Sequence, residues 1–147
     1  MTSRPVPRPR SDFTWFHPIQ TRWSDNDQYG HVNNVVFYAY FDTAVNAFLI
    51  GEAGLAPVGG TWQGLVVDTR CSYFAPARYP EALEAGISFA ERGRTSQTYE
   101  IGIFRTGEPM TLAHGRFVHV YVDTATGRPA ALPDSLLAAM ERAGRGG

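Results

Sequence analysis

The sequence predicts an α+β fold in which a curved antiparallel sheet of about five strands wraps around one long central helix. One apolar segment, residues 35–53, has the length and the residue spacing of a buried helix. After Gly60, apolar residues instead occupy every second position in successive segments, which is the pattern of antiparallel strands with one face on a core. One helix combined with such strands gives a two-layer architecture.

Composition places the chain among ordinary globular proteins. It has 147 residues, of which 44% are hydrophobic and 18% charged, so we expect one folded unit. A net charge of −1 disfavours a nucleic-acid partner, and the lone Cys71 cannot form an internal disulfide. The longest apolar run, residues 35–50, is interrupted by Asp42 and Asn46. We therefore expect a cytoplasmic protein without a membrane partner.

The N-terminal part divides into a tail and a first strand. Residues 1–12 alternate Pro and Arg, which favours an extended, disordered tail, and leaves residues 13–143 as a single domain. Residues 13–24 are rich in aromatic and β-branched types and predict a strand. Pro18 near its middle cannot donate to a sheet ladder, so this strand is expected at an edge or to contain a bulge.

The central helix has recognisable ends. Asn33 and Asn34 stand where an N-cap belongs, and Gly54 is suited to a left-handed C-cap. Apolar residues spread nearly all round this helix, so we expect it to be buried on almost every side.

Four more strands and a short helix complete the predicted elements. Turn-like residues separate the strands, which are expected at residues 65–73, 83–90, 98–103 and 110–123. Residues 133–143 predict a C-terminal helix. A sheet with one helix on it leaves open edges, and we expect these to pair in a homodimer or a dimer-of-dimers tetramer.

The polar segment before the central helix is the main candidate site. Asp25, Asp27, Gly30, His31, Asn33 and Asn34 fall within ten residues. A calcium loop would need an oxygen ligand at Tyr29 and a glutamate at Val36, so calcium is rejected. Zinc is rejected because His31 has no second histidine or cysteine near it in the sequence. The sequence thus predicts no metal site.

Carboxylate chemistry beside a helix N-terminus remains possible. Free N–H groups around residues 31–35 would stabilise a developing oxyanion, and a nearby carboxylate could activate water or attack directly. The alternative is that Asp25 and Asp27 only cap a turn or a helix, as most Asp-x-Asp pairs do.

The motif Asp25-x-Asp27-x-x-Gly30-His-Val-Asn-Asn34 with its aromatic helix resembles the 4-hydroxybenzoyl-CoA thioesterase branch of the hotdog-fold acyl-CoA thioesterases and the related acyl-carrier-protein thioesterases. Three supporting motifs follow in the chain: Tyr73-Phe-Ala-Pro-Ala-Arg78, Gly93-Arg-Thr-Ser96 and Val122-Asp-x-x-Thr-Gly127-Arg-Pro129. The resemblance covers about residues 16–133 and implies a hotdog fold.

The resemblance also implies roles within the first motif. Asp27 becomes the catalytic carboxylate, acting as nucleophile or general base, and the backbone N–H near Asn34 polarises the thioester carbonyl. His31 falls on a histidine used by the acyl-carrier-protein relatives, but their asparagine two residues earlier is Tyr29 here. Asp25, Gly30 and Asn33 become structural supports of the site.

Two further groups are implied for substrate binding. Arg92, Arg94 and Ser96 resemble the hairpin that meets the CoA phosphates, although arginines at a hairpin tip are more often simply solvated. An acyl pocket is expected from Tyr38, Phe41 and Trp62, for each of which plain core packing is the alternative.

The expected function is hydrolysis of an acyl-CoA to a free carboxylic acid and CoA, without a cofactor. Two alternatives remain open. One is a hydratase or dehydratase acting on acyl thioesters, and the other is a non-catalytic acyl-CoA-binding sensor or subunit.

Overall fold

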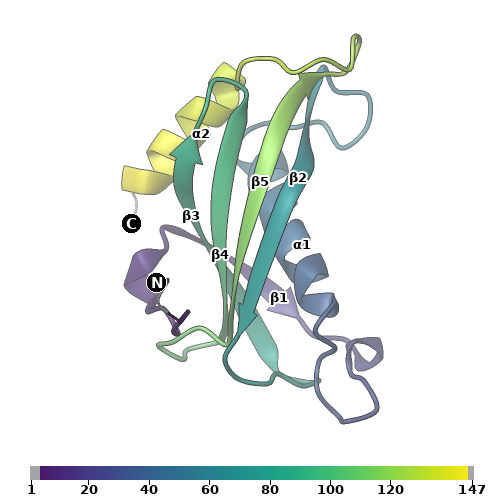
Figure 1. Ribbon diagram of the computed structural model, residues 1–147, viewed down its shortest axis with the longest axis vertical. Helices are drawn as coiled ribbons and strands as arrows, with labels where there is room; N and C mark the ends of the chain where they lie inside the picture. Colours follow the sequence, from purple (N-terminus) through teal and green to yellow (C-terminus); the bar gives the residue numbers. More distant parts are fainter. Residues whose placement is uncertain (1–3, 146–147) are drawn as a thin grey trace.

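A computed structural model describes residues 4–145 and confirms the predicted α+β architecture. All neighbouring strands are antiparallel, in the sheet order β1-β3-β4-β5-β2, and α1 lies behind the sheet in the view of Figure 1. The strands are β1 (Trp15–Gln20), β2 (Trp62–Tyr73), β3 (Ala82–Arg92), β4 (Ser96–Arg105) and β5 (Ala113–Asp123). The helices are α1 (Val36–Gly51) and α2 (Asp134–Arg145), with single 3₁₀ turns at Arg10–Asp12 and Trp23–Asp25.

Side chains that alternate along β4 and β5 form the two faces of the sheet. Tyr99, Ile101 and Ile103 of β4 are completely buried in the core that packs against α1. On β5 the same face includes Gly115, where an added Cβ would lie 2.6 Å from a ring carbon of Phe41. The helix therefore approaches the sheet closely at a position where only glycine leaves room.

The helix is shorter at both ends than predicted. Its N-cap residue is Val35 rather than Asn33 or Asn34, because the Asn33 side chain closes a turn one step earlier by accepting from the Val35 N–H (3.1 Å). The helix ends at Gly51 with Glu52 as C-cap. Gly54 nevertheless has the left-handed conformation expected of it (φ +73°), which lets the chain turn away.

Burial of α1 is one-sided in the single chain, which differs from the expectation of burial on almost every side. Phe41, Ala44, Val45 and Phe48 face the sheet and are completely buried. Ile50 is 43% exposed on the other side of the helix. The exposed side of α1 also carries Ala39, Asp42 and Thr43, so it is largely the polar edge of the helix.

The N-terminal segment is docked onto the protein, so the prediction of a disordered tail is wrong for residues 8–12. Arg8 exchanges two hydrogen bonds with Thr111, one through its N–H (2.9 Å) and one through its carbonyl oxygen (3.0 Å). The Arg10 guanidinium pairs with Glu84 and lies 4.6 Å from the centre of the Phe104 ring. Both arginines find partners distant in sequence. Residues 1–3 of the predicted tail lie outside the described residues.

The two edge strands differ in character. β1 is an edge strand, as Pro18 predicted, and pairs with β3 alone. A proline is tolerated there because the open side of an edge strand needs no backbone N–H donor for a sheet hydrogen bond. β2 forms the opposite edge and pairs only with β5 within the chain. Its Leu65, Val66 and Val67 are 44%, 43% and 59% exposed, which is unusual for an apolar strand centre.

Tyr99, His119 and Tyr121 form a polar cluster that is buried in the core. The hydroxyl groups of Tyr99 and Tyr121 are 2.6 Å apart, and His119 Nδ1 lies 3.4 Å from the Tyr121 hydroxyl. His119 is 1% exposed, and its Nε2 has no hydrogen-bond partner among residues 4–145. Burial disfavours the charged imidazolium and lowers the pKa of His119 from 6.5 to about 4.

This burial predicts a pH-dependent stability. Between pH 6.5 and 4 the unfolded chain binds a proton at His119 that the folded chain does not, so the free energy of unfolding falls as the pH drops, by up to about 3 kcal/mol. His119→Gln should flatten this slope in urea denaturation measured across the range. An unchanged slope in His119→Gln would contradict the assignment.

Candidate active site

The predicted polar segment forms a loop between β1 and α1. Figure 1 shows this loop at the lower end of the molecule, where α1 begins. Within it, the 3₁₀ turn Trp23–Asp25 is followed by a tight turn around Gly30, which has a left-handed backbone (φ +78°). A bridge between Asn26 and Val32 closes the base of that turn. The structure therefore brings Asp25, Asp27 and His31 together at one end of the helix.

Asp25 is completely buried and links the loop to the helix. Its carboxylate accepts hydrogen bonds from the Tyr40 hydroxyl (2.6 Å), the Arg22 backbone N–H (2.9 Å) and the Arg22 guanidinium (2.9 Å). Burial opposes ionisation, but the hydrogen bonds from Tyr40 and Arg22 and the guanidinium charge outweigh it and lower the Asp25 pKa. The Asp25 carbonyl oxygen also accepts from the Asn33 N–H (2.9 Å). These contacts describe a support rather than a reacting group.

Asp27 is held differently, by its own turn. Its Oδ1 accepts from the Tyr29 N–H (2.8 Å), while its backbone N–H donates to the His31 carbonyl oxygen (2.8 Å). The Gly30 N–H donates to the Asp27 carbonyl oxygen (3.0 Å). The side chain is half-buried, and Oδ2 has no partner among residues 4–145. Asp27 thus presents a fixed carboxylate with one oxygen available to a ligand.

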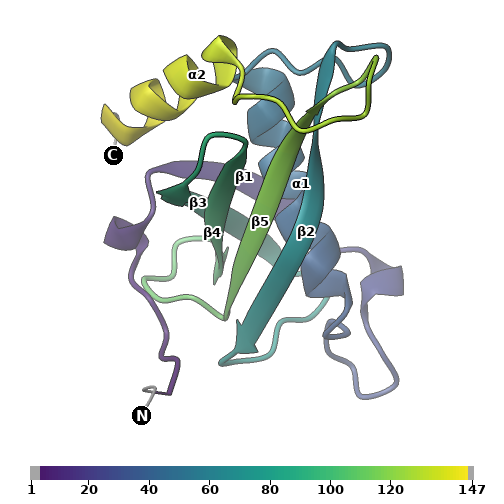
Figure 2. The same cartoon turned by 45° about the horizontal axis from the view of Figure 1, so that its top comes forward.

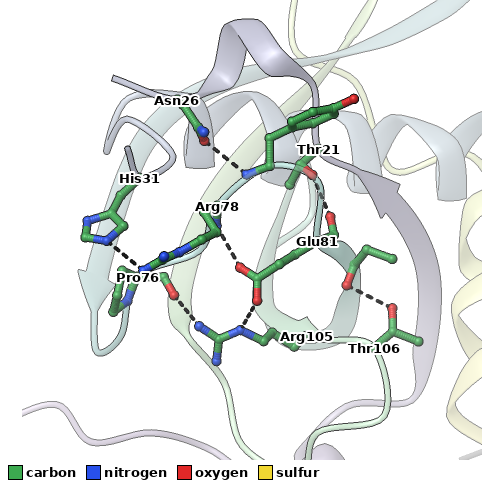
Figure 3. Close-up of polar contacts among 10 residues, drawn as sticks. Thr21, Asn26, His31, Pro76, Arg78, Glu81, Arg105 and Thr106 are labelled. Carbon is green, nitrogen blue, oxygen red and sulfur yellow. Dashed lines mark hydrogen bonds and ion pairs between the residues drawn. The ribbon is translucent and has the colours of Figure 1, made fainter. Parts of the chain in front are cut away.

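His31 contacts a residue that sequence analysis did not assign to the site. Arg78 Nη2 lies 3.1 Å from His31 Nε2 (Figure 3). A guanidinium donates but cannot accept, so in this contact Nε2 is the acceptor and the neutral ring has its proton on Nδ1. The only signal for Arg78 in the sequence is its place in the motif that begins at Tyr73.

A second loop, residues 74–81, braces the candidate site. The Val32 N–H donates to the Ala77 carbonyl oxygen (2.7 Å), and the Tyr79 N–H donates to Asn26 Oδ1 (3.0 Å). Figure 3 shows Glu81 at the centre of this loop, accepting from the Arg78 N–H and from the Arg105 guanidinium. The loop that holds Arg78 against His31 is therefore anchored to β4.

The start of α1 offers fewer free donors than expected. The N–H groups of Val35 and Val36 are both occupied by Asn33, through its side-chain and backbone oxygens. The Asn34 N–H donates to no acceptor among residues 4–145, and the Asn34 carbonyl oxygen accepts from the Tyr73 hydroxyl (2.7 Å). Of the oxyanion donors predicted around residues 31–35, the N–H groups of His31 and Asn34 have no acceptor among residues 4–145.

Known proteins share the sequence pattern and the fold of this chain. The chain matches the thioesterase-like superfamily over residues 21–140. It belongs to this superfamily.

Individual relatives agree with the fold. The PA5185 protein from Pseudomonas aeruginosa strain PAO1 is 47% identical and superposes with a TM-score of 0.90, over 93% of this chain and 96% of that one. Slr0204, a 1,4-dihydroxy-2-naphthoyl-CoA thioesterase from Synechocystis, is 20% identical with a TM-score of 0.74, over 85% and 93%. The uncharacterized protein YsmA of Bacillus subtilis (strain 168) is 25% identical over 126 residues, 85% of this chain and 84% of that protein. The fold is the hotdog fold.

The hairpin predicted to meet CoA lies far from Asp27 within one chain of this thioesterase-like protein. The β3–β4 hairpin stands at the upper end of the sheet beside α2, opposite the Asp27 loop (Figures 1 and 2). The Arg94 carbonyl oxygen accepts from the Leu132 N–H just before α2 (3.2 Å). The Arg92 guanidinium contacts Gln97, and the Ser96 carbonyl oxygen accepts from the Gly93 N–H. The structure does not bring these residues to Asp27.

Of the three residues predicted for the acyl pocket, Tyr38 and Phe41 are in ring contact, with centroids 6.0 Å apart, whereas Trp62 contacts Tyr121 instead. Phe41 is completely buried in the core, and Tyr38 stacks on Phe117. Trp62 stands at the start of β2, where it lines a cavity of about 500 Å³ together with Asn46 and Leu55. Asp27 lines none of five cavities of 340 to 630 Å³ in the described chain. A closed acyl pocket beside Asp27 stays a prediction.

Two further findings concern partners of this thioesterase-like chain. Among residues 4–145, no three side chains of His, Cys, Asp or Glu are placed to hold a metal ion, and the absence of a cofactor stays a prediction. A helix of the length and apolarity needed to span a bilayer is not found in the same residues.

The contrast between the two aspartates predicts unequal effects on stability. Asp25→Asn places an amide N–H₂ group among hydrogen-bond donors and leaves the Arg22 guanidinium without its negatively charged partner. The free energy of unfolding should therefore fall by about 2–4 kcal/mol. Asp27→Asn keeps the oxygen that accepts from Tyr29 and should change it by less than about 1 kcal/mol. Urea denaturation of both variants tests this pair. Equal losses would show that Asp27 is as structural as Asp25.

Proposed function

We propose that this protein is an acyl-CoA thioesterase that hydrolyses an acyl-CoA to a free carboxylic acid and CoA. The main support is Asp27, a carboxylate with one unengaged oxygen at the start of α1 in a chain of the thioesterase-like superfamily. Asp25 is excluded from the reacting role by its complete burial and its three hydrogen-bond donors.

In the proposed reaction the Asn34 N–H donates to the thioester carbonyl oxygen as negative charge develops there. Asp27 acting as general base takes a proton from water while the water oxygen bonds to the carbonyl carbon. The C–S bond then breaks, and the CoA thiolate takes up the proton from Asp27. If Asp27 instead attacks the carbon itself, an acyl anhydride forms, CoA leaves, and water hydrolyses the anhydride.

His31 is proposed to orient or bind the substrate. Its contact with Arg78 leaves the Nδ1–H free to donate a hydrogen bond, while Nε2 is occupied. A neutral donor at this position can hold a substrate oxygen beside Asp27 without competing for the proton that Asp27 transfers.

The Asp27 role predicts a large loss of activity without a loss of folding. Asp27→Asn should lower kcat at least about 100-fold in a thiol-release assay over a panel of acyl-CoAs, because the amide can neither accept the proton nor attack. Asp134→Asn, at the exposed start of α2, is the matched control and should retain wild-type activity. Full hydrolysis by Asp27→Asn would overturn the mechanism.

The same assay separates hydrolysis from both alternatives, which differ from each other in whether the acyl group is converted. A hydratase or dehydratase would convert enoyl or hydroxyacyl thioesters without releasing thiol. A sensor or structural subunit would bind acyl-CoA and release no thiol from any of them.

We further propose a homodimer, alone or within a dimer-of-dimers tetramer, formed through β2. This strand has an open edge and exposed apolar residues, which together are suited to pairing with a second copy. Two identical strands paired antiparallel place the start of one beside the end of the other. Trp62 and the 92–96 hairpin of one subunit would then lie at the end where the partner holds its Asp27, which supports a shared site.

The proposed interface predicts the oligomeric state. Light scattering during size-exclusion chromatography should give a dimer or tetramer mass for the wild type, and a monomer mass for the double variant Leu65→Lys/Val67→Lys, because lysines on an edge oppose strand pairing. Val58→Lys, in a loop where the valine is 90% exposed, should leave the mass unchanged. A monomeric wild type at micromolar concentration would refute the interface.

A further inference from the structure

The outer face of the sheet, opposite α1, has a cavity of about 340 Å³ beneath the N-terminal segment. This volume is at the lower end of the range of about 300–1,000 Å³ for small-molecule sites. Its floor is formed by β2, β4 and β5, and Pro5 and Val6 of the N-terminal segment form part of its rim. The charged and titratable residues that line it are Arg4, Arg8, Arg70, Arg116, His114 and Glu100.

Two of these arginines oppose each other directly. Arg70 of β2 and Arg116 of β5 are Cα partners in the antiparallel ladder, so their side chains project from the same face at adjacent positions. Like charges at directly opposed positions destabilise a strand pair. Only one carboxylate, Glu100 on β4, lines the same cavity.

Nearby carboxylates compensate two of the four arginines, and Glu100 Oε2 also lies 4.0 Å from Arg8 Nη1. Glu91 pairs with Arg116 from the exposed side, and Asp12 pairs with Arg8. Arg4 and Arg70 have no ion-pair partner among residues 4–145. Two guanidinium groups therefore face a concave site with their charges uncompensated.

The N-terminal segment is fixed where it delivers its arginines to this face. The two hydrogen bonds between Arg8 and Thr111 and the bridge between Pro9 and Met110 hold it against the chain that leads into β5. His114 adds a buried Nε2 without a hydrogen-bond partner in the described chain, 3.9 Å from Glu100 Oε2. The concave site thus combines hydrogen-bond donors from β2, β5 and the N-terminal segment, with the Glu100 carboxylate of β4 beside them.

We propose that this cavity binds a phosphoryl or diphosphate group. Guanidinium groups match the oxygens of a phosphate in charge and in planar, bidentate geometry, and an oxyanion between Arg70 and Arg116 would remove their repulsion. Phe74, Pro5 and Val6 provide an apolar wall for the remainder of a phosphorylated compound. The site is separate from the Asp27 loop. The Tyr73 side chain bonds to Asn34 beside that loop, whereas the neighbouring residues Ser72 and Phe74 line this cavity on the other face of the sheet.

Isothermal titration calorimetry with inorganic pyrophosphate, in low-salt buffer, tests the proposal. Wild type should bind, and Arg70→Gln should weaken binding at least tenfold without lowering the melting temperature, because Arg70 has no ion pair to lose. Arg128→Gln, an exposed arginine outside the cavity lining, should bind within twofold of wild type. No binding by wild type, or equal weakening in the two variants, would overturn the proposal.

The source of the phosphoryl group is distinguished by competition. If the site takes the phosphates of CoA, CoA should displace pyrophosphate and pantetheine should not. If it takes a separate phosphorylated compound, neither should displace it, while the Arg70→Gln effect remains. Both results support the site, and neither depends on thioester hydrolysis, so failure of the proposed enzyme function is measured independently.

Discussion

The buried carboxylate of Asp25 links the loop that carries Asp27 to the central helix. It accepts from Tyr40 on α1 and from both the backbone and the guanidinium of Arg22, at the end of β1. A buried charge without these donors would be costly by several kcal/mol, so the carboxylate fixes the distance between strand end and helix. Through Tyr40 this contact joins the loop to α1, and through Arg22 it joins the loop to the residues that follow β1.

Two aspartates separated by one residue acquire different chemistry from this arrangement. Asp25 is ionised and fully satisfied, and none of its oxygens is left for a ligand. Asp27 is positioned by backbone hydrogen bonds of its own turn, which demand little of its side chain. The loop of residues 74–81 is held to β4 by the contact between Glu81 and Arg105. Arg78 of the same loop contacts His31 and so limits the movement of its ring. Rigid support around an unengaged carboxylate is what general-base or nucleophilic catalysis requires.

Local patterns predicted the elements well, and contacts between distant residues account for the differences. Alternation along the later strands and the apolar stripe of the helix are local signals, so element order and the edge position of Pro18 were predictable. That residues 8–12 are ordered was not predictable, because the contact between Arg10 and Glu84 forms only when the chain folds. Arg78 was missed as a neighbour of His31 for the same reason. The resemblance assigned the catalytic role to Asp27 and a supporting role to Asp25, and in the structure Asp25 is buried whereas Asp27 is half-buried.

One disagreement between sequence and structure is informative about assembly. The sequence of α1 is apolar nearly all round, yet the sheet of one chain buries only one side of it and leaves Ile50 exposed. The open edge of β2 is likewise apolar at Leu65 and Val67. Exposed apolar surface of this kind is typical of interfaces, so Ile50 and the β2 edge would have a common explanation in the proposed second subunit. The second subunit would also supply Trp62 and the 92–96 hairpin, which one chain holds at the end of its sheet opposite its own Asp27.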